Sequence, residues 1–97
     1  MSRFDLARRA LVDLQDIWEY ISGDSFDAAD RVLEDFYRAF GQLAEMPRMG
    51  HKRADLTSRD VLFWPVHSYL IIYRPSPLRI VRVIHGKRDV RKLLKKR

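Results

Sequence analysis

The sequence predicts an α+β protein in which a helical hairpin packs on one face of a mainly antiparallel β-sheet. Residues 7–21 and 29–44 carry apolar side chains every three or four positions, as amphipathic helices do. From residue 59 onward, β-branched and aromatic residues dominate in three short runs, as strands do. A chain of 97 residues builds one hydrophobic core, so we expect a single domain over residues 1–97.

The helices are expected to follow a short strand at Arg3–Leu6. The first helix ends near Gly23, and the second begins near Ser25, whose side chain can accept a backbone N–H of the first turn. Pro47 ends the second helix because it lacks an N–H donor and restricts the residue before it. The connection between the two helices, from about Gly23 to Ser25, is so short that the helices must run antiparallel. The polar side of the first helix is expected to hold Arg8, Arg9, Asp13, Asp16 and Glu19.

The strand runs are Val61–Trp64, Tyr69–Tyr73 and Arg79–Ile84. Pro75-Ser76-Pro77 separates the last two and suits a hairpin loop. Both faces of the middle run are apolar, which is typical of a central strand covered on both faces, or of one face waiting for a partner. The last segment, Asp89–Arg97, has the pattern of a short basic helix. The expected order is therefore β-α-α-β-β-β with a short C-terminal helix.

Charge is divided unevenly along the chain, whose net charge is +6. Residues 1–46 hold ten acidic and five basic side chains, whereas residues 47–97 hold three acidic and fourteen basic ones. Such a cationic half attracts polyanions, which are nucleic acid, an acidic protein segment or anionic lipid. The chain has no cysteine and only three scattered histidines, so we expect neither metal nor cofactor. No run approaches the ~20 apolar residues of a membrane span, and the charged opening does not fit a secretory signal, which favours the cytoplasm.

A series of short motifs resembles the ParE toxins of the RelE/ParE superfamily, from Leu6 to about Leu94. The matching motifs are the helix Leu6–Ile21, Leu43-Ala44 followed by Pro47 and Gly50, Arg53 with Asp55-Leu56, Arg59, Tyr69–Arg74, Arg82–Gly86 and Arg88-Asp89. The resemblance implies a toxin of a type II toxin-antitoxin system in the bacterial cytoplasm, with DNA gyrase as the usual target. It also implies neutralisation by a ParD-like antitoxin of the ribbon-helix-helix type, with DNA contacted only through that antitoxin.

We expect the basic surface to contact the target through the positively charged side chains of Arg59, Lys87, Arg88 and Arg91. The basic segment 87–97 has no recognised DNA-reading motif and no interleaved aromatic residues for stacking on bases. We therefore favour contact with protein, with solubility as a further interpretation. A plain nucleic-acid-binding domain is a third class, marked by strong salt-dependent DNA affinity.

The alternative function is that of the RelE-like branch, which cuts messenger RNA on the ribosome. That chemistry needs an acid, a base and cations over the scissile phosphate. The candidates are Arg53, Arg59 and Arg74 as a phosphate clamp and His85 as acid or base. In such nucleases a Tyr commonly follows the His-basic-acidic stretch, where this chain has Arg91. We therefore predict no catalytic residue, and we expect His85 to orient a turn by hydrogen bonding.

The antitoxin is expected to dock where the helices leave apolar surface uncovered. A helical hairpin covers one face of a small sheet, so the other face, or the groove beside the hairpin, should accept an amphipathic helix, with an extended tail along the sheet as an option. The strand arginines Arg59, Arg74 and Arg82 fit either a target surface or charged edges that oppose aggregation. Trp18 and Trp64 are expected to be buried or half-buried because of their size.

Overall fold

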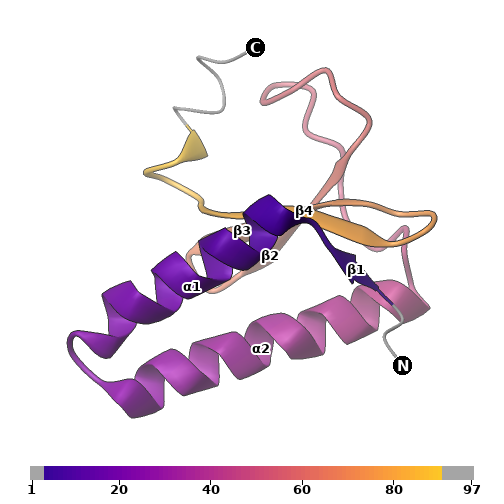
Figure 1. The fold of residues 1–97 in the computed structure, drawn as a ribbon. Helices are drawn as coiled ribbons and strands as arrows, with labels where there is room; N and C mark the ends of the chain where they lie inside the picture. Colours follow the sequence, from indigo (N-terminus) through magenta and orange to yellow (C-terminus); the bar gives the residue numbers. More distant parts are fainter. Residues whose placement is uncertain (1–3, 91–97) are drawn as a thin grey trace.

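The computed structural model describes residues 4–90 and has the predicted order of elements (Figure 1). The elements are β1 (Asp5–Leu6), α1 (Arg8–Ser22), α2 (Phe26–Glu45), β2 (Leu62–Val66), β3 (Tyr69–Arg74) and β4 (Arg79–His85). This confirms the α+β class and the β-α-α-β-β-β order. Apart from Asp89 and Val90, the helix expected over Asp89–Arg97 lies outside the described residues.

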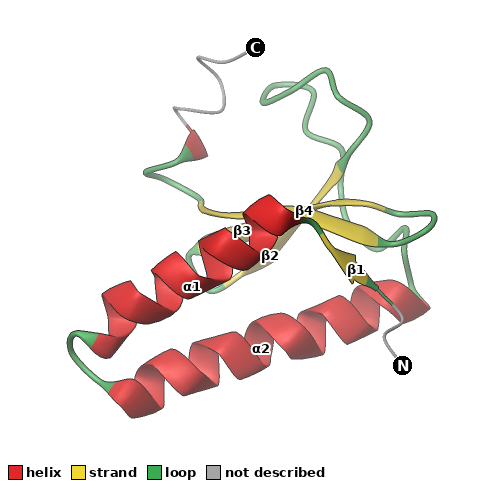
Figure 2. Cartoon of the chain, in the orientation of Figure 1, coloured by secondary structure: helices red, strands yellow, loops and turns green. Residues whose placement is uncertain are grey.

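The four strands form one mixed sheet in the order β1-β4-β3-β2. β4 pairs antiparallel with β3, and β3 pairs antiparallel with β2. β1 runs parallel to β4, with Asp5 opposite Arg79. Both helices lie on one side of the sheet, whereas the loop before β2 projects from the other side, and the turn after β4 leaves the sheet beside α1 (Figure 2). The sheet therefore separates a helical layer from a layer of loops.

Local signals set the ends of the helical hairpin. The Ser25 hydroxyl accepts the Ala28 backbone N–H at 3.1 Å and caps α2, as predicted. α2 ends at Glu45, before Pro47. Near the tip of the hairpin, the Trp18 indole N–H donates to Asp30 at 2.9 Å, which ties α1 to α2. Trp18 and Trp64 are both half-buried, so the expectation for the tryptophans is confirmed.

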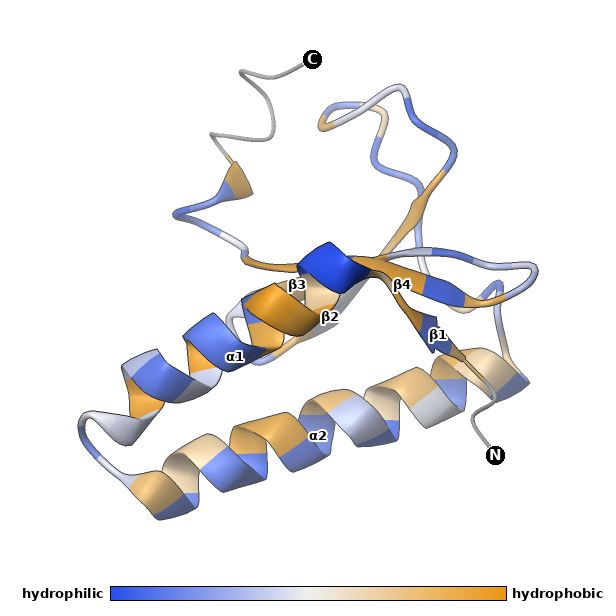
Figure 3. Ribbon diagram, viewed as in Figure 1, coloured by the Kyte–Doolittle hydropathy of each residue, from blue (hydrophilic) through white to orange (hydrophobic). Residues whose placement is uncertain are grey.

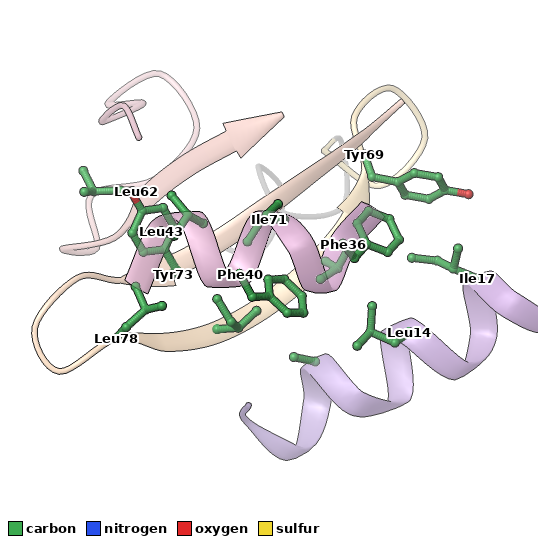
Figure 4. Close-up of a cluster of buried hydrophobic side chains, with 14 residues drawn as sticks. Leu14, Ile17, Phe36, Phe40, Leu43, Leu62, Tyr69, Ile71, Tyr73 and Leu78 are labelled. Atoms are coloured by element: carbon green, nitrogen blue, oxygen red, sulfur yellow. The ribbon is translucent and has the colours of Figure 1, made fainter. Parts of the chain in front are cut away.

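The main core lies between the helices and the sheet (Figure 4). Its buried side chains include Leu14, Ile17, Phe36, Phe40, Leu43, Leu62, Ile71 and Ile80. β3 lies in the middle of the sheet and contributes a residue to this core at every second position, from Tyr69 to Tyr73. The apolar helical stripes and this strand face thus cover each other.

Tyr73 fixes the segment after α2 to the centre of the sheet. Its ring is fully buried, and its hydroxyl donates to the Pro47 carbonyl and accepts the Gly50 N–H, both at 2.8 Å. Burial raises the pKa of Tyr73, so the phenol stays neutral at physiological pH. A Cβ at Gly50 would lie 2.5 Å from the Tyr73 hydroxyl oxygen. Glycine is therefore required at position 50 for a steric reason.

The second face of the sheet carries a smaller core. Leu56 and Val61, from the loop before β2, are buried against Phe63, Ile72 and Ile84 of the strands. Half-buried Leu70 and Val90 pack at the margin of this cluster. The expectation that this face could stay open for a partner is wrong, because the chain covers it with its own loop. Leu56 is an isolated apolar residue between polar ones, so periodicity could not reveal this role.

The outer edge of β2 offers little backbone for a further strand. Phe63 exchanges two backbone hydrogen bonds with His51, at 2.8 and 2.9 Å. Two positions further along the same edge, Pro65 has no N–H to donate. These features block edge-to-edge pairing, as Pro and short bridges commonly do on sheet edges.

Candidate interaction surface

In the folded chain, the acidic side chains are concentrated in the helical layer and the basic ones in the layer of strands and loops. The helical hairpin, residues 8–45, holds nine acidic and four basic side chains, whereas residues 47–90 hold nine basic and three acidic ones. Hydrophilic residues cover the loops and the outward sides of the helices (Figure 3). Exposed basic residues gather in the loop before β2, at Lys52, Arg53 and Arg59, and in the turn after β4, at Lys87 and Arg88. The strand-and-loop layer is thus the candidate surface for an anionic partner.

A groove of about 380 Å³ lies between α1 and the part of β4 that extends beyond its pairing with β1. We call it the α1–β4 groove. It is lined by Arg9, Asp13, Asp16, Ile17, Tyr20, Tyr69, Arg82, Val83, Ile84, Arg88 and Asp89. At its rim the Arg88 guanidinium lies 5.2 Å from the centre of the Tyr20 ring, in a cation–π contact. Burial raises the pKa of Tyr69 and keeps this phenol neutral. The groove is therefore lined mainly by charged and polar groups, with the apolar side chains of Ile17, Val83 and Ile84 between them.

Asp13 holds α1 against the edge of β4. Its carboxylate accepts Nε of Arg82 at 2.7 Å, Nη2 of Arg82 at 3.2 Å and the backbone N–H of Val83 at 3.0 Å. Such a bidentate pair, completed by a backbone donor, satisfies a buried charge. The expectation that Asp13 lies on the polar side of its helix is wrong, since the residue is only 7% exposed. Its spacing from Ala10 and Ile17 places it on the apolar face, and that signal was present in the sequence.

His85 orients the turn that follows β4. Its Nδ1 accepts the backbone N–H groups of Lys87 at 3.2 Å and Arg88 at 3.1 Å. Its own backbone N–H donates to Asp89 at 3.0 Å. The interpretation of His85 as a turn-forming residue is confirmed by these bonds. The Val83 N–H donates to Asp13 and the His85 N–H donates to Asp89, so two outward N–H groups of β4 are occupied. An extended antitoxin tail therefore finds no free row of donors on this edge.

The residues named for a nuclease clamp do not meet at one place. Arg74 pairs with Arg79 at one end of β3, and His85 pairs with Tyr69 at the other end, five residues or about 17 Å away. Arg53 lies in the loop that enters β2 near the Arg74 end, where it forms a bidentate pair with Asp55 at 2.9 and 3.0 Å. That pair lowers the pKa of the Asp55 carboxyl. The geometry gives no joint acid, base and phosphate clamp.

The residues named for target binding fall into two groups. Lys87 and Arg88 are exposed side by side on the turn after β4. Lys87 also lines a second hollow of about 620 Å³ beside the β2–β3 turn. Arg59 is exposed in the loop before β2, at the opposite end of the sheet. Arg91 lies outside the described residues.

The described residues contain no cluster of side chains suited to bind a metal ion. Within residues 4–90, no three His, Asp or Glu side chains gather closely enough to hold an ion. Neither helix in that part of the chain has the length and apolar character needed to cross a membrane.

The fold is similar to that of a solved structure described as the chromosomal ParDE TA system from P. aeruginosa. The similarity covers 90% of this chain and 98% of that chain, with a TM-score of 0.73 and 17% sequence identity. The two chains thus share the same fold over nearly their whole lengths.

A family model described as the ParE toxin of type II toxin-antitoxin system, parDE, matches residues 4–90. The chain belongs to this ParE toxin family, which confirms the resemblance seen in the sequence. Among curated proteins, none matches the chain significantly in sequence.

Proposed function

We propose that this chain inhibits DNA gyrase as the toxin of a type II toxin-antitoxin pair, and that a ParD-like ribbon-helix-helix antitoxin neutralises it in the bacterial cytoplasm. The observation that carries the proposal is the match of the ParE toxin family to residues 4–90. The similar fold in a structure described as a ParDE system supports a ParD-like partner.

Two features favour inhibition by binding over chemistry. His85 uses Nδ1 to hold the turn after β4, so this nitrogen is engaged in the folded protein. The arginines named for a phosphate clamp lie toward the other end of the sheet. By contrast, exposed cations such as Lys87 and Arg59 need only a complementary surface to contribute to binding.

The test is a supercoiling assay with purified gyrase, run beside a translation extract in which messenger RNA is followed. We expect loss of supercoiling at chain concentrations comparable to that of gyrase, with intact messages. Normal supercoiling together with cut messages would replace the proposal with RelE-like cleavage. Tight, salt-dependent binding of duplex DNA by the chain alone, with gyrase unaffected, would replace it with a nucleic-acid-binding function.

Charge reversals locate the target surface. Lys87→Glu and Arg59→Glu should each raise the concentration needed for half inhibition by about tenfold, because each replaces attraction by repulsion at the interface. Arg31→Glu is the matched control, since Arg31 is exposed on α2, in the acidic layer. Equal effects of all three variants would point to net charge alone as the cause.

A further inference from the structure

We propose that the hollow beside the β2–β3 turn binds a single phosphate group, either free or carried by a small phosphorylated molecule. This hollow has a volume of about 620 Å³, and we call it the β2–β3 hollow. It lies where two turns meet, because the Gly86 N–H after β4 donates to the Ser68 carbonyl between β2 and β3 at 2.8 Å. Its polar lining groups therefore come from two segments that a backbone bond holds together.

His85 offers a hydrogen-bond donor to a ligand in the hollow. Its Nδ1 accepts the N–H groups of Lys87 and Arg88, so it carries no proton, and the neutral ring holds its proton on Nε2. Within residues 4–90, every buried side-chain nitrogen or oxygen atom has a hydrogen-bond partner. Nε2 of His85 has no partner in that part of the chain, so it must be accessible to solvent. An accessible N–H in the lining of the hollow can donate to an anionic oxygen.

Lys87 and Ser68 supply a positive charge and a further donor. Both residues are exposed, and both line the hollow. Among the described residues, neither the Lys87 ammonium nor the Ser68 hydroxyl has a hydrogen-bond or ion-pair partner. One ammonium group and two neutral donors suit a phosphate group, which carries about −1.5 to −2 charges at pH 7 when it is a monoester.

The lining of the hollow contains no carboxylate, as far as the structure describes the chain. The acids that bond to its lining residues are Asp35, which contacts Nε2 of His67 at 2.7 Å, and Asp89, which accepts the backbone N–H of His85 at 3.0 Å. Both carboxylates are thus engaged outside the hollow. By contrast, three carboxylates line the α1–β4 groove. Of these two concave sites, the β2–β3 hollow is therefore the one that favours an anion.

The remaining lining of the hollow suits a compact organic group. Pro65, Tyr69 and Leu70 line the hollow beside the polar groups. The volume is within the range of pockets that bind small ligands, roughly 300–1,000 Å³, and leaves room beyond a phosphate. A flat group such as a nucleoside base could therefore lie on these side chains while the phosphate meets Lys87.

A single phosphate group fits the surroundings better than a nucleic-acid strand does. Arg88, the next cation along the chain, lines the α1–β4 groove and not the hollow. It lies there with Asp16 and Asp89, which would repel the next phosphate of a strand.

The experiment titrates the isotope-labelled chain with inorganic phosphate, adenosine monophosphate or adenosine at constant ionic strength, and follows the backbone amides by NMR. Phosphate and the monophosphate should shift the amide signals of Ser68, Gly86 and Lys87 with a dissociation constant on the order of 1 mM or lower. Adenosine alone should leave these signals unchanged, because it has no phosphate.

Three variants assign the binding to the hollow. Lys87→Ala removes the charge, and His85→Asn keeps an acceptor for the turn but removes the Nε2 donor. Each should weaken binding by about tenfold, as expected for a lost hydrogen bond to a charged group. Arg88→Ala removes the same charge from the neighbouring residue and should bind like the wild type. Unchanged amide signals of Lys87 and Arg88 in the ligand-free His85→Asn variant check that the turn is intact.

The outcomes also identify the source of the phosphate. Tighter binding of adenosine monophosphate than of phosphate assigns the hollow to a phosphorylated organic molecule, and equal binding assigns it to free phosphate. Affinity that survives both Lys87→Ala and His85→Asn would overturn the inference, as would equal losses in Lys87→Ala and Arg88→Ala. A single-stranded oligonucleotide that binds more tightly than the monophosphate, and loses affinity with Lys87→Ala, would assign the hollow to nucleic acid instead. None of these results depends on the gyrase assay, so the proposed function is tested separately.

Discussion

The two faces of the sheet are both covered, but by different means. On one face, two helices bury a continuous core that includes Phe36, Phe40 and Tyr73. On the other face, a mostly polar loop reaches the strands through Leu56 and Val61. The helical layer is acidic and the loop layer is basic. We propose that the helix-covered face stabilises the fold, whereas the loop-covered face presents cations to partners.

The sharpest test of this comparison is Phe40→Ala. Phe40 is fully buried and packs edge-on against Phe4, with ring centres 5.4 Å apart. Its removal should lower the free energy of unfolding by about 3–5 kcal/mol, from lost burial and a residual cavity. Chemical denaturation measures this value. A loss below about 1 kcal/mol would mean that the helical layer is not the stabilising one.

Leu56→Ala tests the loop-covered face. Leu56 is 4% exposed but belongs to a cluster of only five buried residues. The cost should be about 2 kcal/mol, near the low end for a buried leucine, because the loop can relax. Hydrogen exchange should become faster in the loop before β2 while β3 stays protected. Met46→Ala, at an exposed position, is the control. Uniformly faster exchange would contradict the division between the faces.

Tyr73→Phe keeps the packed ring and removes only the hydroxyl on the helix-covered face. The Pro47 carbonyl and the Gly50 N–H would then lose their partner. Unsatisfied groups of this kind cost about 1–2 kcal/mol, measured by thermal or chemical unfolding. An unchanged stability would show that water replaces the hydroxyl.

The smallest effect is expected at the contact between α2 and the β2–β3 turn. The hydrogen bond from His67, at 2.7 Å, lowers the pKa of Asp35 below its ordinary value of 3.8. A lowered pKa adds stability above pH 3.8 that is lost as pH falls through the pKa of the folded state. Asp35→Asn should therefore flatten the acid limb of the stability curve slightly. Identical acid limbs in the two proteins would remove this contact from the list of stabilising ones.

The sequence alone determined the local elements and the family. Ser25, Pro47 and the apolar spacing set helix ends and faces because these signals act within a few residues. The apolar residues on both faces of β3 likewise predicted a central strand. The motif order identified the ParE family over nearly the whole chain.

Only the tertiary structure decided how distant residues meet. Asp13 binds Arg82, which lies 69 positions later in the sequence. Leu56 covers one face of the sheet, and the residues around it in the sequence do not predict this contact. The parallel pairing of β1 with β4 is another such contact. No local propensity encodes these pairs, because their energy arises when the folded chain brings them together and excludes water around them. The α1–β4 groove is a product of the same long-range contacts.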